Sequence, residues 1–431
     1  MTIAGDAADL RAGALAVLDR NRRGGYTVPA EGLYPYQWCW DAGPIALGWA
    51  AAGHWDEAWS ELRTLLSAQW DSGFVPHIVF WVPGDDYFPG PEVWGTRHDP
   101  ETTGITQPPL PLVAAARLYV GDPDRQRARR ELSPLWPRLI AWVAWLARAR
   151  TGPHGACVVV HPWESGMDNS PCWDAPLARV PRADDLDLRR RDLETVAAAR
   201  RPTERDYRHY LGIVQVLRDA GWDTERQVEV SPFAVEDPAF TAIAARGARE
   251  LAGVATDLGA DGRVFTEFAR AAGDGLARLW DEDAGWFRPY DLRGETALEP
   301  LTASGLVAAW CDEVSGVQVA RMLARVDDWS GHVAELVTTC DPSATEFDAQ
   351  RYWRGPVWVL VNWLVAEGLA RVGEHPRAEA LRQSTLRLVA THGFTEYYDP
   401  ITGEGIGGRA FSWSAALTLA WLLPHDFARS A

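Results

Sequence analysis

The stretch RGPVWVLVNWLVAEGLARVGEHPRAEALRQSTLRLVAT (354–391) indicates the fold class of the chain. Its apolar residues recur every three or four positions, which is the period of a helix that buries one face. We expect one helix over 354–371, since Pro356 suits a first helical turn, and a second over 376–391. The stretch therefore predicts two helices joined by a short link.

Helical periodicity also dominates the rest of the chain. Strand patterns are few and lie at 158–162 and, within a hairpin, at 285–292. Many paired helices could form an open superhelix, but the chain lacks the fixed-period repeat of such solenoids. We therefore predict an all-α fold, an (α/α)6 barrel with long loops at one end. The other predicted helices cover residues 7–20, 41–52, 55–69, 107–119, 126–149, 206–220, 238–258, 264–280, 303–313, 315–325 and 411–422.

Three long loops, at 81–107, 163–205 and 392–410, interrupt the helices. Loops of this length in a compact domain are usually functional or disordered, and their Trp, Tyr and Pro content argues against disorder. Residues 180–205 are the exception, because their charge density fits a mobile flap or a solvated surface helix. No linker divides the chain, so we expect a single catalytic domain over 1–431 with an inserted flap at about 175–205.

Composition excludes several classes of function. The chain has 23 Trp, a net charge of −17 and no Lys, so all 42 of its basic residues are Arg. This charge argues against a nucleic-acid partner, and the lack of lysine excludes Schiff-base and P-loop lysine chemistry. The five Cys have no disulfide or zinc spacing. Neither a signal peptide nor a long apolar stretch is present, so we expect a cytoplasmic protein without membrane contact.

The segment LYPYQWCWDAG (33–43) places aromatic residues at alternate positions, followed by Asp41. Such residues line one face of an extended segment. Aromatic rings can stack on a pyranose, and a neighbouring carboxylate can accept hydrogen bonds from its hydroxyl groups. Trp38 and Trp40 are therefore candidate sugar contacts. The alternative is a buried strand in which Asp41 caps the next helix.

The segment HPWESGMDNSPCWD (161–174) carries three carboxylates among Trp residues: Glu164, Asp168 and Asp174. Apolar rings raise the pKa of a nearby carboxyl group, which suits a general acid at neutral pH. The alternative is a structural turn before Pro171.

Two later segments carry further candidates. In GFTEYYDPITGEGIGGRAFSWSA (393–415), Glu396 precedes two Tyr, and the alternative is a solvated β-turn that carries Glu404. Tyr352 and Trp353 lie on the loop that enters the 354–371 helix. No metal motif or nucleotide loop is convincing, so neither a metal ion nor a cofactor is expected.

Together these motifs resemble the inverting α-glycosidases of glycoside hydrolase family 63, with trehalases as more distant relatives. The resemblance implies an (α/α)6 catalytic domain, with Asp168 as general acid and Glu396 as general base. It spans nearly the whole chain, in the family's order. The matching phrases are QWCWDAG (37–43), ESGMD (164–168), YWRGPVW (352–358), EYYDP.TG (396–403) and FSWSA (411–415).

Length and the phrase LYPYQW are most similar to the small bacterial hydrolases of mannosylglycerate and glucosylglycerate. This implies that Trp40, Asp41 and Trp358 hold the sugar at the scissile bond. The residues that would surround the glycerate are Tyr34, Tyr87, Gln107, Arg201, Tyr207, Tyr352 and Trp353.

An inverting glycosidase needs a protonated carboxyl group, the acid, and an ionised carboxylate, the base. The two lie roughly 6.5–9.5 Å apart, so that a water molecule fits between the base and the sugar. Because lysine is absent, an arginine must supply the cation for an acidic aglycone, and the resemblance implies that it is Arg201. We therefore predict a small-molecule sugar substrate that carries a carboxylate. The choice of glucose or mannose and the oligomeric state stay open. A trehalase-like α-glucosidase, a sugar epimerase and a non-catalytic sugar-binding protein are the alternatives.

Overall fold

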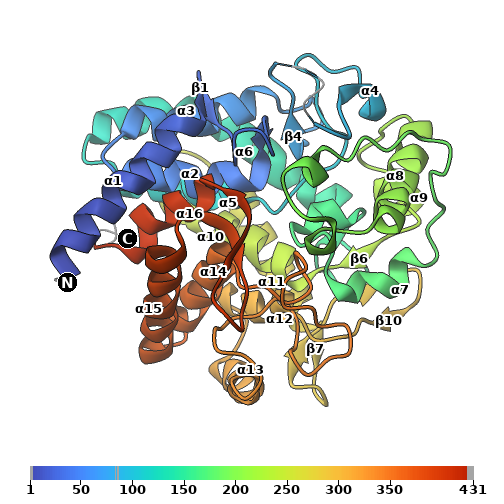
Figure 1. Cartoon of the computed structure of the whole chain (residues 1–431). Coiled ribbons are helices and arrows are strands. Elements are labelled where there is room, and N and C mark those ends of the chain that lie inside the picture. Colours follow the sequence, from blue (N-terminus) through green and yellow to red (C-terminus); the bar gives the residue numbers. More distant parts are fainter. Residues whose placement is uncertain (1–2, 83, 85–86, 425–431) are drawn as a thin grey trace.

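The computed structural model describes residues 3–82, 84 and 87–424, and helices make up most of it (Figure 1). The predicted helix-rich fold is thereby confirmed. One series, called here the inner helices, is buried along most of its length. Each inner helix contacts the next one along the chain, and the last contacts the first. The inner helices are α2 (Cys39–Ala51), α5 (Leu110–Gly121), α10 (Pro238–Leu258), α12 (Ala303–Val307), α14 (Val359–Arg371) and α16 (Ser412–Leu417).

A second series, the outer helices, packs one apolar face against the first. In α11 (Arg263–Ala277), for example, Phe265, Phe268, Ala272 and Leu276 are buried at helical spacing, and α11 contacts α10. The remaining outer helices are α1 (Ile3–Asn21), α3 (Trp55–Ser67), α6 (Arg125–Ala149), α13 (Gly316–Trp329) and α15 (His375–His392).

Within the described part of the chain, no helix is both long and apolar enough to cross a bilayer.

The inner helix α10 begins and ends where the sequence predicts, at residues 238 and 258. Pro238 occupies its first turn, and the Asp237 carboxylate caps the start by accepting a 2.8 Å hydrogen bond from the Ala239 amide. Gly259 ends the helix in a left-handed conformation, at φ +74°. Local sequence signals therefore determine both ends of this helix.

The predicted start of the 354–371 helix is wrong, because α14 begins only at Val359. Val357 forms isolated β-bridges to Thr338 and Tyr398 instead, and Trp358 is extended. Val357 thus exchanges backbone hydrogen bonds with the distant Tyr398, and only Trp358, through its carbonyl, bonds to the helix that follows. This keeps the preceding Tyr352 and Trp353 on a loop.

Strands are short and lie between the helices. The predicted strand at 158–162 is β5 (Val158–Val159), and the predicted 285–292 segment contains β8 (Trp286–Phe287) and β9 (Tyr290–Asp291). A hairpin that the sequence does not predict, β11 (Thr395–Tyr398) with β12 (Gly405–Arg409), follows α15. The other strands are β1 (Arg22–Arg23), β2 (Tyr26–Thr27), β3 (Gln37–Trp38), β4 (Ile78–Val79), β6 (Val235–Glu236), β7 (Trp280–Asp281) and β10 (Thr296–Ala297).

The segment between α6 and α10 is long and mostly irregular. From 175 to 205 it contains only short helical turns and the first residues of α8, so of the two alternatives for this segment the surface helix is absent. Its helical pieces are η1 (Pro162–Ser165), η2 (Pro171–Trp173), α7 (Asp174–Leu177), η3 (Arg191–Glu194), η4 (Ala198–Arg200), α8 (Glu204–Asp219) and α9 (Gln227–Val230). Elsewhere lie the short α4 (Pro91–Trp94), η5 (Ala308–Trp310) and the π-turn η6 (Thr418–Leu422).

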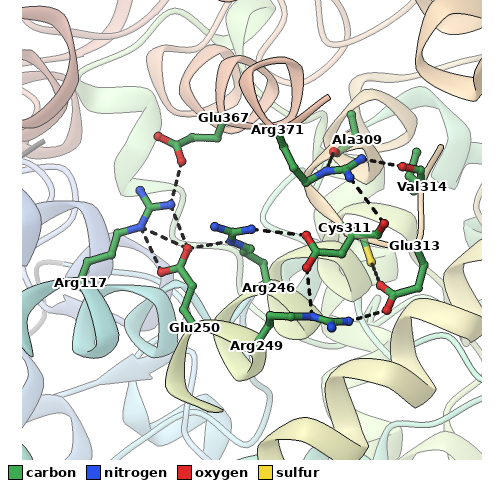
Figure 2. A network of polar contacts seen from close by, with 11 residues as sticks. Arg117, Arg246, Arg249, Glu250, Ala309, Cys311, Glu313, Val314, Glu367 and Arg371 are labelled. Carbon is green, nitrogen blue, oxygen red and sulfur yellow. Dashed lines mark hydrogen bonds and ion pairs between the residues drawn. The ribbon is translucent and has the colours of Figure 1, made fainter. Parts of the chain in front are cut away.

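Charged side chains connect α5, α10 and α14 toward their C-terminal ends (Figure 2). The Arg117 guanidinium donates to Glu250 at 3.0 Å and to Glu367 at 2.7 Å, so one cation joins all three helices. Its carbon lies 5.5 Å from the centre of the Trp310 ring and 5.8 Å from that of Trp363. Removing one partner would leave a largely buried charge unpaired, at a cost of about 3–5 kcal/mol, so these three helices depend on all three charged partners at this end.

Candidate active site

A pocket at the opposite end gathers residues from distant parts of the sequence around a cavity of about 60 Å³. The segments that enter α2, α5, α14 and α16 all contribute side chains to it, so the N-terminal ends of four inner helices face the cavity. Helix N-termini carry partial positive charge and favour anions. The cavity is lined by Pro29, Tyr34, Trp38, Trp40, Asp41, His77, Tyr87, Gln107, Trp163, Gly166, Asp168, Arg201, Tyr207, Tyr352, Trp353, Glu396, Phe411 and Trp413.

Glu396 lies on β11, opposite an irregularity in the pairing with β12. Its Oε1 accepts hydrogen bonds from the Tyr34 hydroxyl at 2.8 Å and from Arg201 Nη1 at 3.4 Å, and its Oε2 accepts one from the Gly408 amide at 2.8 Å. Gly407 has φ +78°, and a Cβ there would lie 2.3 Å from Glu396 Oε2. The hairpin thus allows three donors to surround one buried carboxylate.

Asp168 follows the tight turn after η1. Gly166 has φ +74°, and a Cβ on it would lie only 2.8 Å from the Trp40 ring, so this turn requires glycine. The Asp168 carbonyl accepts a 2.8 Å hydrogen bond from the Tyr210 hydroxyl. In the described part of the chain, no other residue donates a hydrogen bond to the Asp168 carboxyl group, which contrasts with the three donors around Glu396.

Burial shifts the titration of both groups. It raises the pKa of Asp168 from its usual 3.8 to about 7, against the lowering effect of the Arg201 charge. It also raises the pKa of Glu396 above its usual range, again opposed by Arg201 and by the Gly408 amide. A carboxyl group without external donors holds a proton more readily than one with three donors. The pair can therefore supply one acid and one base near neutral pH.

Arg201 is buried and lies at the centre of the polar contacts. Its Nη2 donates to the Tyr34 hydroxyl at 2.9 Å, and its guanidinium carbon lies 4.1 Å from the centre of the Tyr352 ring. Tyr352 has a positive φ of 42°, which is unusual for a residue with a side chain and is typical of functional sites. A planar guanidinium at this position can bind a carboxylate through two hydrogen bonds.

Several buried polar atoms at the pocket have no protein partner among the described residues. They are Asp41 Oδ1, His77 Nδ1 and Trp353 Nε1. Burial raises the pKa of Asp41 well above its usual range and lowers the pKa of His77 well below its usual range. Because unpaired buried polar groups are costly, these atoms are suited to hydrogen-bond a polyhydroxylated ligand.

The predicted contact residues differ in their placement. All of the site residues named from the sequence line the cavity except Trp358. Trp358 is fully buried and stacks on Trp353, with ring centres 3.6 Å apart, so it supports Trp353 instead of facing the cavity. Gln107 has a further role, because its side-chain oxygen accepts a 3.2 Å hydrogen bond from the Trp40 amide near the start of α2.

The other carboxylates of the motif segments lie away from the cavity. Glu164 is fully buried in an ion pair with Arg150 at 3.1 Å, and Asp174 pairs with Arg354 at 2.7 Å. Glu404 is exposed, as the β-turn interpretation predicts. Of the motif carboxylates, the pocket thus contains Asp41, Asp168 and Glu396.

Sequence reasoning missed other residues that line the cavity. Pro29 and His77 carry no motif that marks them, and the pairing of β3 with β4 brings His77 close to Trp38. Phe411 and Trp413 belong to the phrase FSWSA and Trp163 directly precedes ESGMD, so the phrases of the family resemblance could have identified them. Among the residues that the structure describes, no three His, Cys, Asp or Glu side chains gather so as to hold a metal ion.

Comparisons with known proteins agree with this picture. Residues 34–414 match the family model of the mannosylglycerate hydrolase MGH1-like glycoside hydrolase domain. A mannosylglycerate hydrolase of Thermus thermophilus is 43% identical, over 95% of this chain and 99% of its own length. A glucosylglycerate hydrolase of Mycolicibacterium hassiacum is 35% identical, over 96% and 97%. The crystal structure of a GH63 mannosylglycerate hydrolase from Thermus thermophilus with Tris and D-glycerate superimposes with a TM-score of 0.93, over 96% of this chain and all of that one, at 43% identity.

Proposed function

The chain belongs to the mannosylglycerate hydrolase MGH1-like glycoside hydrolase family, and we propose that it hydrolyses mannosylglycerate or glucosylglycerate with inversion at the anomeric carbon. The products would be the free sugar and glycerate. The observation that carries this proposal is the placement, in one pocket, of Asp168 without external donors and of Glu396 with three donors. The resemblance identified from the sequence is confirmed by these comparisons.

Asp168 would act as the general acid. Its pKa of about 7 keeps a large fraction of the group protonated at neutral pH, so it can donate a proton to the departing glycosidic oxygen. The adjacent rings of Trp40 and Trp353 would stack on the sugar and exclude water from the reacting bond.

Glu396 would act as the general base. Hydrogen bonds from Tyr34, Arg201 and Gly408 stabilise its ionised form. An ionised carboxylate can take a proton from a water molecule that attacks the anomeric carbon from the face opposite the leaving group. One displacement then inverts the anomeric configuration without a covalent intermediate.

Arg201 would bind the glycerate carboxylate. Among the described residues that line the pocket, Arg201 is the one arginine, and it presents two Nη groups on the pocket wall. Tyr34 and Tyr352 surround its guanidinium and would contact the same aglycone. After it donates to Glu396 and Tyr34, each Nη group keeps a second hydrogen that an aglycone carboxylate could accept, which favours a carboxylate-bearing substrate.

The closed series of contacts among the inner helices supports an (α/α)6 barrel as the architecture of this chain. We propose a single catalytic domain over 1–431 in which residues 175–205 form an inserted flap beside the pocket. Arg201 and the turn η3 belong to this flap. The cytoplasmic location stays a prediction from the sequence.

The pH dependence of kcat/KM should follow the two carboxyl groups. Asp168 must be protonated, so the rate should fall about tenfold per pH unit once the pH exceeds about 7. Glu396 must be ionised, so the rate should also fall as the pH decreases through its raised pKa. Initial rates on mannosylglycerate between pH 4 and 9 test this, with Tm followed to exclude unfolding. A rate that stays constant up to pH 9 would contradict the role of Asp168.

A panel of substrates tests the proposed function itself. Release of sugar should be fastest from mannosylglycerate or glucosylglycerate, slower from the methyl α-glycosides and slowest from trehalose. Activity on trehalose alone would show that the aglycone assignment is wrong. Isomerisation of free mannose or glucose without hydrolysis would instead identify an epimerase on the same fold.

A further inference from the structure

Two charged residues of the flap, Arg190 and Asp192, lie directly behind Arg201 and do not line the cavity. Asp192 Oδ2 accepts hydrogen bonds from Arg201 Nε at 3.1 Å and from Arg190 Nη2 at 2.7 Å, and its Oδ1 accepts one from Arg190 Nε at 2.8 Å. All three side chains are at least about nine-tenths buried. We call this set the Arg190–Asp192–Arg201 cluster.

The cluster is itself anchored to the wall of the pocket. The guanidinium of Arg190 lies 3.6 Å from the centre of the Tyr207 ring, and its Nη1 and Nη2 each donate to the Pro202 carbonyl at 3.1 Å. Arg190 therefore has partners for its stacking face and for its hydrogen-bonding edge. This fixes the position of the Asp192 carboxylate.

Asp192 determines which edge of Arg201 faces the substrate. The Nε group is bound from behind by Asp192, so Nη1 and Nη2 both point toward the pocket residues Glu396 and Tyr34. A guanidinium binds a carboxylate in two-point fashion only when an edge with two donors is correctly oriented. Without Asp192, Nε would be a buried donor without its partner, and Arg201 could rotate to satisfy it.

Asp192 also limits the pairing between Arg201 and the base. The Arg201–Glu396 contact is long, at 3.4 Å, whereas the contact to Asp192 is 3.1 Å. Asp192 is also paired with Arg190, so two cations, Arg190 and Arg201, face the two carboxylates of Asp192 and Glu396. Nη1 and Nη2 each use one hydrogen for Glu396 or Tyr34 and keep a second one for the carboxylate that arrives with the substrate.

We propose that Asp192 is a positioning residue, which orients Arg201 so that the Nη edge receives the carboxylate of the aglycone. The inference rests on the proposed function and names the flap residue through which that function selects an acidic aglycone. Asp192 and Arg190 do not line the cavity, so they would influence specificity only through Arg201.

The test compares Asp192→Asn with the wild type in binding and in turnover. Loss of one charge-assisted hydrogen bond should weaken D-glycerate binding, measured by calorimetry, by about 10- to 100-fold. The KM for the sugar glycerate should rise by a similar factor, while kcat/KM for the methyl α-glycoside of the same sugar should change by less than about threefold. Glu194→Gln is the matched control, because Glu194 lies on the same turn, η3, is exposed and, among the described residues, pairs with Arg191 alone.

A second variant separates positioning from general damage to the fold. Arg190→Gln leaves the Asp192 carboxylate in place but removes its anchor, so glycerate binding should weaken by a smaller factor than in Asp192→Asn. Asp192→Glu should restore part of the binding. Equal losses on the glycerate substrate and on the methyl glycoside would overturn the inference, as would unchanged glycerate binding in Asp192→Asn. If the wild type itself does not bind glycerate, the aglycone assignment and the inference both fail. Equal losses on both substrates, or unchanged glycerate binding in Asp192→Asn, would overturn the inference alone and leave the proposed function standing.

Discussion

Replacement of Asp168 by Asn should lower kcat/KM for the sugar glycerate by about 100- to 10,000-fold, the range that general acid catalysis supplies. Asparagine has nearly the shape of aspartic acid but cannot transfer a proton to the leaving oxygen. The carboxyl group has no donor from another described residue, so an amide fits its surroundings without breaking an ion pair. Steady-state assays of sugar release measure the effect.

Asp174→Asn is the matched control for this variant, since Asp174 follows in the same segment but forms a half-exposed pair with Arg354 outside the cavity. It should retain wild-type turnover. Glycerate binding should survive in Asp168→Asn, because Arg201 and its partners are untouched. Turnover within tenfold of the wild type in Asp168→Asn would show that another group protonates the leaving group.

Glu396→Gln should be at least as damaging, with kcat reduced by about 100- to 10,000-fold. The amide cannot remove a proton from the attacking water. The amide NH2 group would also face groups that already donate hydrogen bonds to this side chain, so the local geometry should change as well. These donors are the Tyr34 hydroxyl, Arg201 Nη1 and the Gly408 amide. Single-turnover measurements on the variant should place the loss in the chemical step.

Glu404→Gln serves as the control for Glu396→Gln, because Glu404 lies between the strands of the same hairpin but is exposed. Its turnover should match the wild type. A substrate with a better leaving group should not rescue Glu396→Gln, but should partly rescue Asp168→Asn, because only the acid assists departure of the leaving group. Rescue of both variants, or of neither, would contradict the assignment of the two roles.

The sequence predicts features that depend on local signals. The α10 helix has a proline in its first turn and a glycine at its end, and its bounds agree with the prediction. The aromatic context marks Asp168 and Glu396 as candidates, but it marks Glu164 and Asp174 as well, and only the family resemblance implies which carboxyl groups act as acid and base.

Features that depend on long-range pairing could not be predicted. Residues 354–358 look helical, but Val357 bridges to Tyr398, and this displaces the start of α14. The same periodicity cannot say which of two neighbouring rings faces a cavity: Trp353 and Trp358 are both predicted contacts, and of the two only Trp353 lines the cavity.

The charged segment 175–205 illustrates the same limit in electrostatic terms. In the sequence, Asp192 is one of many acids among arginines and resembles a solvated surface residue. Only the fold turns it inward, so that it accepts hydrogen bonds from Arg201 and Arg190 in a buried position. The charge run therefore contains a buried carboxylate, paired with a pocket-lining arginine, that composition alone would assign to the surface.

The anomer that is formed first tests the central claim most directly. Proton NMR should follow the wild-type enzyme on α-linked mannosylglycerate and glucosylglycerate, at time points shorter than the mutarotation of the free sugar. If Asp168 and Glu396 act as acid and base in one displacement, the β-anomer should appear first and the α-anomer only as mutarotation proceeds. Initial release of the α-anomer would contradict the account, because it requires a covalent intermediate and a nucleophile in place of the base.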